Sequence, residues 1–132
     1  MGYTVDLEGD DLWCKSQQDA EAAQKLVEAD EWIHPYHLEV CAMEAQSEEF
    51  KGRWYLCVEH FQGDHWRDWE ARQVWLAIAP HMGDGATIEL QGEDGSRWRI
   101  HWQEGRVFEE YVGEVVWVVN EEITAPVEEK MS

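Results

Sequence analysis

Apolar and polar residues alternate at the start of the chain, in the pattern of a half-buried strand over Tyr3–Leu7 whose outward positions are mainly acidic. The apolar period then lengthens to that of an amphipathic helix over residues 17–30. Ser16 stands at the expected N-cap, and Asp19 lies in the first turn, where a negative charge opposes the helix dipole. Pro35 marks the break that follows.

Further along, the pattern predicts two strands, a second helix and a meander. The helix has Asp64 as its expected cap and ends near Pro80. Glu104-Gly105 is typical of a two-residue hairpin turn, after which one bent strand or two short ones follow. The predicted strands of this part are Leu38–Met43, Trp54–Phe61, Ala86–Gln91, the alternating residues 97–103, Val107–Val112 and Glu114–Val119.

The resulting order, β-α-β-β-α-β-β-β, predicts an α+β fold with a mostly antiparallel sheet and two helices packed on one face. A length of 132 residues suits one domain. We expect that domain to cover residues 1–120 and to be followed by an acidic C-terminal tail over residues 121–132.

Charge changes this picture more than any other property of the composition. The chain has 29 acidic and 10 basic residues, a formal net charge of −19, whereas solubility alone needs a magnitude of about 2–8. Because such an excess of negative charge is self-repulsive, we expect it to have a cause. The candidate causes are binding of a basic protein partner, mimicry of nucleic acid, and adaptation to a high-salt cytoplasm. The third explanation ranks lowest, because 20 of the acids are Glu and the chain is rich in Trp. Direct binding of nucleic acid is opposed by the phosphate charge.

The expected location is the cytoplasm. The N-terminus lacks the pattern of a secretory signal, and no apolar run approaches the roughly 20 residues that span a bilayer. Cys14, Cys41 and Cys57 are odd in number and widely spaced, as expected of reduced thiols. We therefore predict no membrane association and no cofactor, and leave the oligomeric state open.

Four histidines are weak candidates for a metal site. Zinc needs four converging ligands, and Pro35, which lies between two of these histidines, breaks the helical spacing that would place that pair on one face. The four are His34, His37, His60 and His65. Cys57 and His60 could form a nucleophile and base, but three positions apart on a strand they are expected on opposite faces. Since no serine lies in a nucleophile elbow either, no catalytic residue is predicted.

Eight of the nine tryptophans fall into two groups. Four stand at inward-facing positions of their elements and are expected in the core: Trp75, Trp98, Trp102 and Trp117. Four others lie at element ends near polar residues, where they are candidate exposed anchors for a partner: Trp13, Trp32, Trp66 and Trp69. A stacking platform for sugars or bases is the alternative use of this second group.

A series of turn motifs in the second half resembles a group of small, acidic, uncharacterised bacterial and phage or mobile-element proteins. It consists of Leu76-Ala77-Ile78-Ala79-Pro80, the segment Asp84–Leu90, Gly92-Glu93-Asp94-Gly95 with Trp98-Arg99, and Glu104-Gly105-Arg106-Val107. The resemblance covers about a third of the chain and implies a mobile-element setting, where small acidic proteins often inhibit host defence machinery. It transfers no catalytic residue.

Two functions from different classes follow. The favoured one is a non-enzymatic binding protein whose acidic face occupies the basic groove of a partner. In its most specific form, it is a phage or mobile-element inhibitor that binds a nucleic-acid-binding defence complex of the host by mimicking nucleic acid. Its predicted face consists of Asp6, Glu8, Asp10, Glu21 and Glu28. The alternative is a small metal- or ligand-binding domain or enzyme with a His/Trp pocket.

Overall fold

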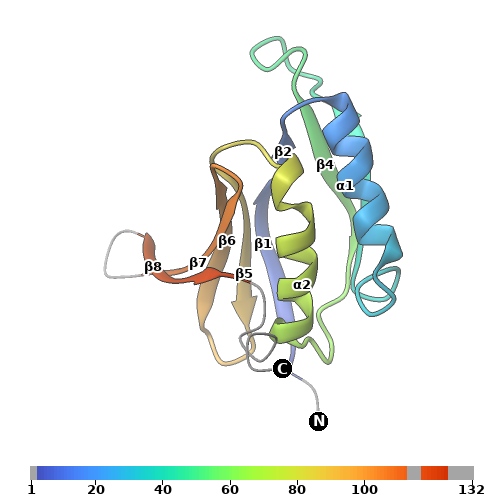
Figure 1. Ribbon diagram of the computed structural model, residues 1–132. Helices are drawn as coiled ribbons and strands as arrows, with labels where there is room; N and C mark the ends of the chain where they lie inside the picture. The colour runs from blue at the N-terminus through green and yellow to red at the C-terminus, as the bar shows by residue number, and fades with distance from the viewer. Residues whose placement is uncertain (1–2, 113–116, 125–132) are drawn as a thin grey trace, which may run out of the picture.

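The computed structural model describes residues 3–112 and 117–124, and these form two antiparallel sheets with two helices (Figure 1). The elements are β1 (Val5–Asp11), β2 (Trp13–Cys14), α1 (Gln17–Ala29), β3 (Leu38–Glu44), β4 (Trp54–Phe61), α2 (Asp68–Ile78), a 3₁₀ turn (Ala79–His81), β5 (Ala86–Gly92), β6 (Arg97–Gln103), β7 (Arg106–Val112) and β8 (Trp117–Ile123). One sheet has the order β1-β5-β6-β7-β8 and the other β2-β4-β3. The predicted α+β class and antiparallel pairing are confirmed.

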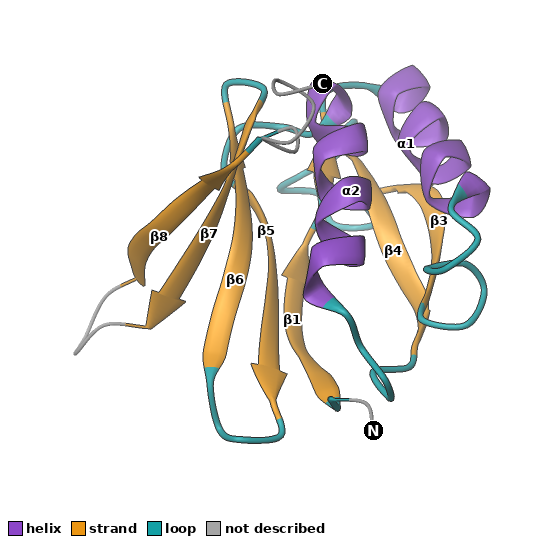
Figure 2. Ribbon diagram, turned by 60° about the horizontal axis from the view of Figure 1, so that its bottom comes forward, coloured by secondary structure: helices purple, strands orange, loops and turns teal. Residues whose placement is uncertain are grey.

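The single sheet of the prediction is divided in two at Leu12. This residue separates β1 from β2, its side chain is buried, and its carbonyl accepts a hydrogen bond of 2.9 Å from the backbone N–H of Leu56 in β4. The chain therefore leaves one sheet and enters the other within a single residue. Both helices lie on the same side of the two sheets, with α1 over β3 and β4 and α2 between the sheets (Figure 2).

Helix α1 begins where the sequence predicts. The Ser16 hydroxyl accepts a hydrogen bond of 3.1 Å from the backbone N–H of Asp19, and Asp19 in turn pairs with His81 at 2.8 Å. Ala20, Ala23 and Val27 form the buried stripe that packs mainly on β3.

Helix α2 begins three residues later than predicted, with Arg67 and not Asp64 at its N-cap, because the preceding loop is bonded to the N-terminal strand. The backbone N–H of Val5 donates to the Gly63 carbonyl at 3.0 Å, and that of Trp66 donates to the Tyr3 carbonyl at 2.8 Å. A Cβ atom at Gly63 would lie 1.6 Å from the Val5 carbonyl oxygen, so only glycine permits this approach. Asp64 does not cap the helix; its carboxylate contacts the Thr4 hydroxyl at 3.4 Å.

The core lies between the sheets and the helices. Trp75 and Trp102 are fully buried, edge to face with ring centroids 6.0 Å apart, and the Trp102 indole N–H donates to the Trp75 carbonyl at 3.0 Å. Trp98 packs against this core half-buried. Trp117 was predicted to be inward-facing, and this is wrong: the Arg99 guanidinium stacks 4.6 Å from its ring, on the sheet face that the helices do not cover.

The last strand also differs from the prediction. β8 runs from Trp117 to Ile123, so Glu121 and Glu122 pair with β7 and do not belong to a tail. Both carboxylates are held by ion pairs, with Arg72 and Arg106 respectively. The beginning of the predicted strand, residues 114–116, and the rest of the predicted tail, residues 125–132, lie outside the described residues.

Candidate binding site

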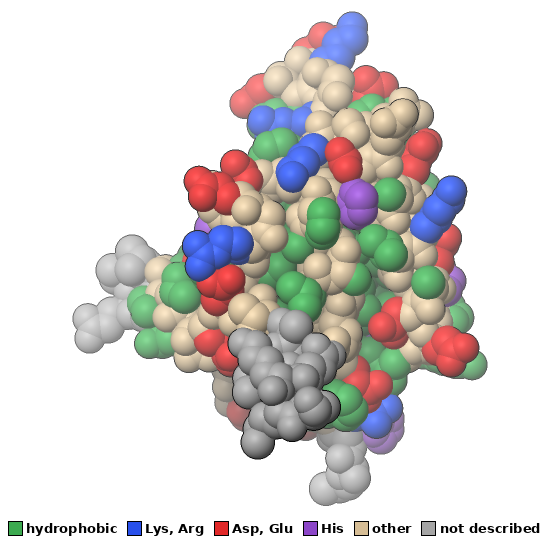
Figure 3. Space-filling model, in the orientation of Figure 1, with side chains coloured by type: hydrophobic (Ala, Val, Ile, Leu, Met, Phe, Trp, Pro, Cys, Tyr) green, Lys and Arg blue, Asp and Glu red, His purple; other side chains and the backbone are tan. Residues whose placement is uncertain are grey.

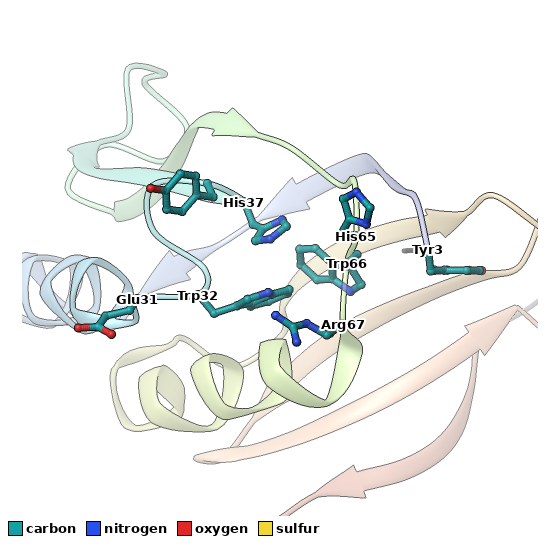
Figure 4. Close-up of a pocket in the computed structure, with 8 residues that line it drawn as sticks. Tyr3, Glu31, Trp32, His37, His65, Trp66 and Arg67 are labelled. Carbon is teal, nitrogen blue, oxygen red and sulfur yellow. The ribbon is translucent and has the colours of Figure 1, made fainter. Parts of the chain in front are cut away.

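Two loops at one end of the molecule enclose an aromatic pocket of about 630 Å³ (Figure 4). The first wall follows α1 and the second precedes α2. The lining residues are Tyr3, Glu31, Trp32, Tyr36, His37, His65, Trp66 and Arg67. We call this the aromatic pocket.

The first wall is shaped by Asp30, which ends α1. Its carboxylate accepts hydrogen bonds from the backbone N–H groups of Trp32 and Ile33 at 3.0 and 2.9 Å. The chain then turns through a cis peptide bond at His34-Pro35 and reaches His37, whose N–H donates to the Ile33 carbonyl at 2.8 Å. Trp32 is thereby fixed at the pocket's inner edge.

Hydrogen bonds join the two walls at His37. The backbone N–H of Gln62 donates to the His37 carbonyl at 2.9 Å, and the His37 Nδ1 lies 2.8 Å from the Gln62 carbonyl oxygen. Because a carbonyl oxygen only accepts, Nδ1 carries the proton. In the neutral ring Nε2 is therefore a hydrogen-bond acceptor at the pocket.

The interior of the pocket is a cluster of rings. Trp32 packs on His37 with centroids 4.2 Å apart and meets Trp66 edge-on at 5.4 Å. Trp66 is buried and continues inward to Trp75 at 6.5 Å, which connects the pocket with the core. Aromatic pairs at these separations contribute beyond the area they bury, so these contacts stabilise the cluster.

Charged groups lie around the rings. The Arg67 guanidinium carbon is 5.8 Å from the Trp32 ring centroid, and its Nε pairs with Glu70 at 2.6 Å. Glu31 lies at the end of the pocket opposite Tyr3 (Figure 4). The Tyr3 hydroxyl donates to the Asp94 carboxylate at 2.6 Å, and this hydrogen bond lowers the pKa of Asp94.

The predicted acidic face is only partly assembled. Asp6, Glu8 and Asp10 are exposed on β1, but a bulge between Leu7 and Gly9 shifts the alternation by one residue. As a result Asp6 pairs with Gln91, whereas Asp10 is in register with the buried Ile88. The side chains therefore do not form the single alternating row that the sequence predicts.

The two helical members of that face lie elsewhere. Glu21 and Glu28 are exposed on α1, which packs on β3 and contacts β4, β2 and α2. On the side of the molecule that carries the helices, acidic and basic side chains are interspersed (Figure 3). Exposed carboxylates nevertheless gather along β1, on both faces of the strand, and they include a residue missing from the prediction, Asp11. We call Asp6, Glu8, Asp10 and Asp11 the acidic band.

The four tryptophans predicted as anchors have different environments. Trp69 is 66% exposed on α2 and is available to a partner. Trp66 is buried, so the expectation that its ring is exposed is wrong. Trp32 is half-buried in the aromatic pocket, and Trp13 is half-buried with the Arg53 guanidinium 4.4 Å from its ring.

The histidines divide in the same way. His37 and His65 line the aromatic pocket, whereas His34 and His60 do not. Across residues 3–112 and 117–124, no three His, Cys, Asp or Glu side chains are grouped so that they could hold a metal ion.

Two of the three thiols, Cys14 and Cys57, are poor nucleophiles. Cys41 and Cys57 lie directly opposite each other on β3 and β4, and a bulge before His60 places that histidine in register with Glu39, on the same side as the two cysteines. The expectation that Cys57 and His60 face opposite ways is therefore wrong. Burial nevertheless raises the pKa of Cys57, and it raises the pKa of Cys14 to about 12. Both are protonated at neutral pH, and the thiolate is the reactive form.

Comparisons with family models, with curated proteins and with solved structures find no match to the chain. Neither described helix is both long enough and apolar enough to cross a membrane.

Proposed function

We propose that the protein is a non-enzymatic acidic binding protein that captures a basic protein partner through the acidic band. The observation that carries this proposal is the density of unpaired charge on β1. Four exposed carboxylates lie within one strand, and the pKa of Asp10 is raised first by desolvation and then by repulsion from Asp11. A segment of protein that tolerates this repulsion is suited to a positively charged ligand.

Internal pairing strengthens the argument. Five of the six arginines already form ion pairs with carboxylates of the same chain. The acidic band has no such partner among the described residues. Its charge is therefore available to another molecule.

The density of carboxylates along β1 supports nucleic-acid mimicry, the sharpest form of the proposal. At about 3.3 Å per residue, the strand from Asp6 to Asp11 extends about 17 Å and carries four carboxylates. One DNA strand presents about five phosphates over the same distance. A nucleic-acid-binding protein, for instance of a host defence complex targeted by a mobile element in the cytoplasm, is the partner that this charge density favours.

The test compares two variants of equal charge. One replaces the acidic band (Asp6→Asn, Glu8→Gln, Asp10→Asn, Asp11→Asn); the control neutralises four exposed glutamates elsewhere (Glu21→Gln, Glu28→Gln, Glu44→Gln, Glu49→Gln). Each is immobilised and exposed to a bacterial lysate at about 50 and 200 mM salt, the range over which phosphate-like contacts weaken strongly. We expect the wild type and the control to retain a nucleic-acid-binding protein that duplex DNA displaces, and the band variant to lose it. Equal capture by both variants, or capture that is indifferent to salt, contradicts the proposal.

A second candidate, binding of a small ligand, is favoured by the aromatic pocket alone. Its rings offer a stacking platform, and the His37 Nε2 offers an acceptor. No described residue group supports a metal-dependent reaction there, so the proposal is restricted to binding.

A further inference from the structure

We infer that the aromatic pocket receives an arginine side chain of the basic partner. The inference rests on the proposed function and extends it, because it names a second contact and the chemistry of the group that fills it.

The chain itself shows which group the ring face of Trp32 accepts. Arg67 holds its guanidinium 5.8 Å from that ring, within the range of a cation–π contact. Its side chain is 56% exposed and is held back by Glu70 at the pocket's edge. An internal guanidinium therefore occupies one side of a pocket that has volume left for another.

Hydrogen-bond acceptors in and beside the pocket suit the same group. The guanidinium is a pure donor, with five N–H groups. The His37 Nε2 is an acceptor, and carboxylates stand at the two ends of the pocket: Glu31 at one end, and Asp94, bound to the Tyr3 hydroxyl, beyond the other (Figure 4). Because Arg67, the cation that lines the pocket, is paired with Glu70, the charge that remains at the two ends of the pocket is negative and favours a cation over a phosphate or a carboxylate.

The pocket is also continuous with the acidic band. Tyr3 lines the pocket and stands two residues before the first residue of β1, and Thr4 between them is bonded to Asp64 and Glu93. A basic segment that lies along β1 thus has further carboxylates in its path to the pocket. Charge complementarity commits the site to a cationic protein segment.

The experiment uses a defined probe, the peptide acetyl-Gly-Arg-Gly-amide, against its citrulline counterpart, which has the same shape without the charge. Binding is followed through the tryptophan indole N–H signals of the full-length protein by NMR. We expect saturable shifts of the Trp32 and Trp66 signals at millimolar peptide, little change at Trp69, and none with citrulline. Equal binding of the citrulline peptide, or shifts confined to Trp69, would overturn the inference.

Substitutions sharpen the result. Arg67→Gln removes the internal competitor, so we expect it to tighten binding of the arginine peptide about two- to fivefold, the range of an exposed cation–π contact. Arg97→Gln, which removes an exposed arginine outside the pocket, is the matched control and should change nothing. Unchanged or weaker binding by the Arg67 variant contradicts the assignment.

The opposite effect is expected when the rings are removed. Trp32→Leu should abolish binding of the peptide, and Tyr36→Ala, at a side chain 72% exposed, should weaken it without loss of the fold. If wild-type protein captures the lysate partner and the Trp32 and Tyr36 variants capture it equally well, the proposed function survives and this inference fails. If wild-type protein captures no partner, yet the peptide still distinguishes arginine from citrulline, the proposed function fails and the pocket's preference stands.

Discussion

Glu110 is the most informative position at which to test how this acidic chain tolerates a buried charge. It lies on β7, on the sheet face that the helices do not cover, and only 8% of its side chain is exposed. One carboxylate oxygen accepts a hydrogen bond of 2.5 Å from Arg99, and the other lies 3.0 Å from the His101 Nδ1. The Arg99 side chain itself is 23% exposed.

The expected magnitude follows from this geometry. Glu110→Gln keeps the volume but removes the charge that the Arg99 guanidinium faces. Loss of one partner of a fully buried pair costs about 3–5 kcal/mol, and a hydrogen bond to a charged group contributes about 1.5–3 kcal/mol. Because Arg99 retains some contact with water and the glutamine oxygen still accepts, we expect a loss of about 2–3 kcal/mol in the free energy of unfolding.

The assay is urea denaturation at pH 7, followed by tryptophan fluorescence. With a slope of about 1.5 kcal/mol per molar urea, the midpoint should fall by between about 1 and 2 M. Glu122→Gln is the matched control, because Glu122 pairs with Arg106 at the surface, and its midpoint should stay near the wild-type value. Similar midpoints for the two variants would refute the reasoning that burial sets the value of the pair.

The pH dependence gives an independent check. Burial alone would raise the pKa of Glu110, but the hydrogen bonds from His101 and Arg99 outweigh it and the pKa is lowered below its ordinary 4.5. A carboxylate with a depressed pKa in the folded state contributes stability above its unfolded pKa. That contribution is lost as the pH falls through the folded value, so the difference between wild type and Glu110→Gln should shrink below about pH 4.5.

Three further predictions concern the framework. Gly63→Ala should lower the unfolding free energy by more than about 2 kcal/mol or prevent folding, because the added methyl group meets the Val5 carbonyl. The control, Gly9→Ala, has open space around it and should change the unfolding free energy by less than about 1 kcal/mol in urea denaturation. Burial and a neighbouring carboxylate raise the pKa of Asp68 to about 6, so the stability that Asp68 contributes should decline as the pH rises from about 4 to 6. The unfolding free energy of wild type relative to Asp68→Asn, measured by denaturation at several pH values, should therefore fall over this range. Ser16→Ala should cost about 1 kcal/mol in thermal unfolding, since it removes the N-cap bond; an unchanged midpoint would contradict the capping role.

Local periodicity predicted much of the fold. The α1 boundary, the strand over Trp54–Phe61 and the turn at Glu104-Gly105 all follow from signals within a few residues, and the structure confirms them. Both turn residues have positive φ, as the hairpin signal requires.

The prediction failed where two distant segments approach each other. The start of α2 depends on how residues 62–67 bond to Tyr3 and Val5, which lie about sixty residues earlier in the chain. Strand bulges caused the other errors. One near Glu8 shifts Asp10 out of the predicted row, and another brings Cys57 and His60 to the same face of β4. No periodicity in the sequence marks an extra residue in a strand, so every face assigned beyond a bulge is inverted.

The aromatic pocket was only half visible in the sequence. The sequence suggested candidate binding residues that do line the pocket: Trp32, Trp66, His37 and His65. No local pattern, however, predicted that the two loops join through His37 and Gln62. A signal was present in retrospect at Gly63, because a glycine that stands before two polar residues and a tryptophan can mark a close backbone approach.

The acidic band and the aromatic pocket have separable roles on this proposal. Charges at the rim of an interface mainly accelerate association and carry its salt dependence, whereas a filled aromatic pocket mainly slows dissociation. Neutralising the acidic band should therefore lower the association rate constant for the captured partner and weaken the dependence of that rate constant on salt. Trp32→Leu should instead raise the dissociation rate constant and leave the salt dependence as it is. A surface-plasmon measurement in which both variants change only the association rate would show that the pocket contributes nothing beyond charge.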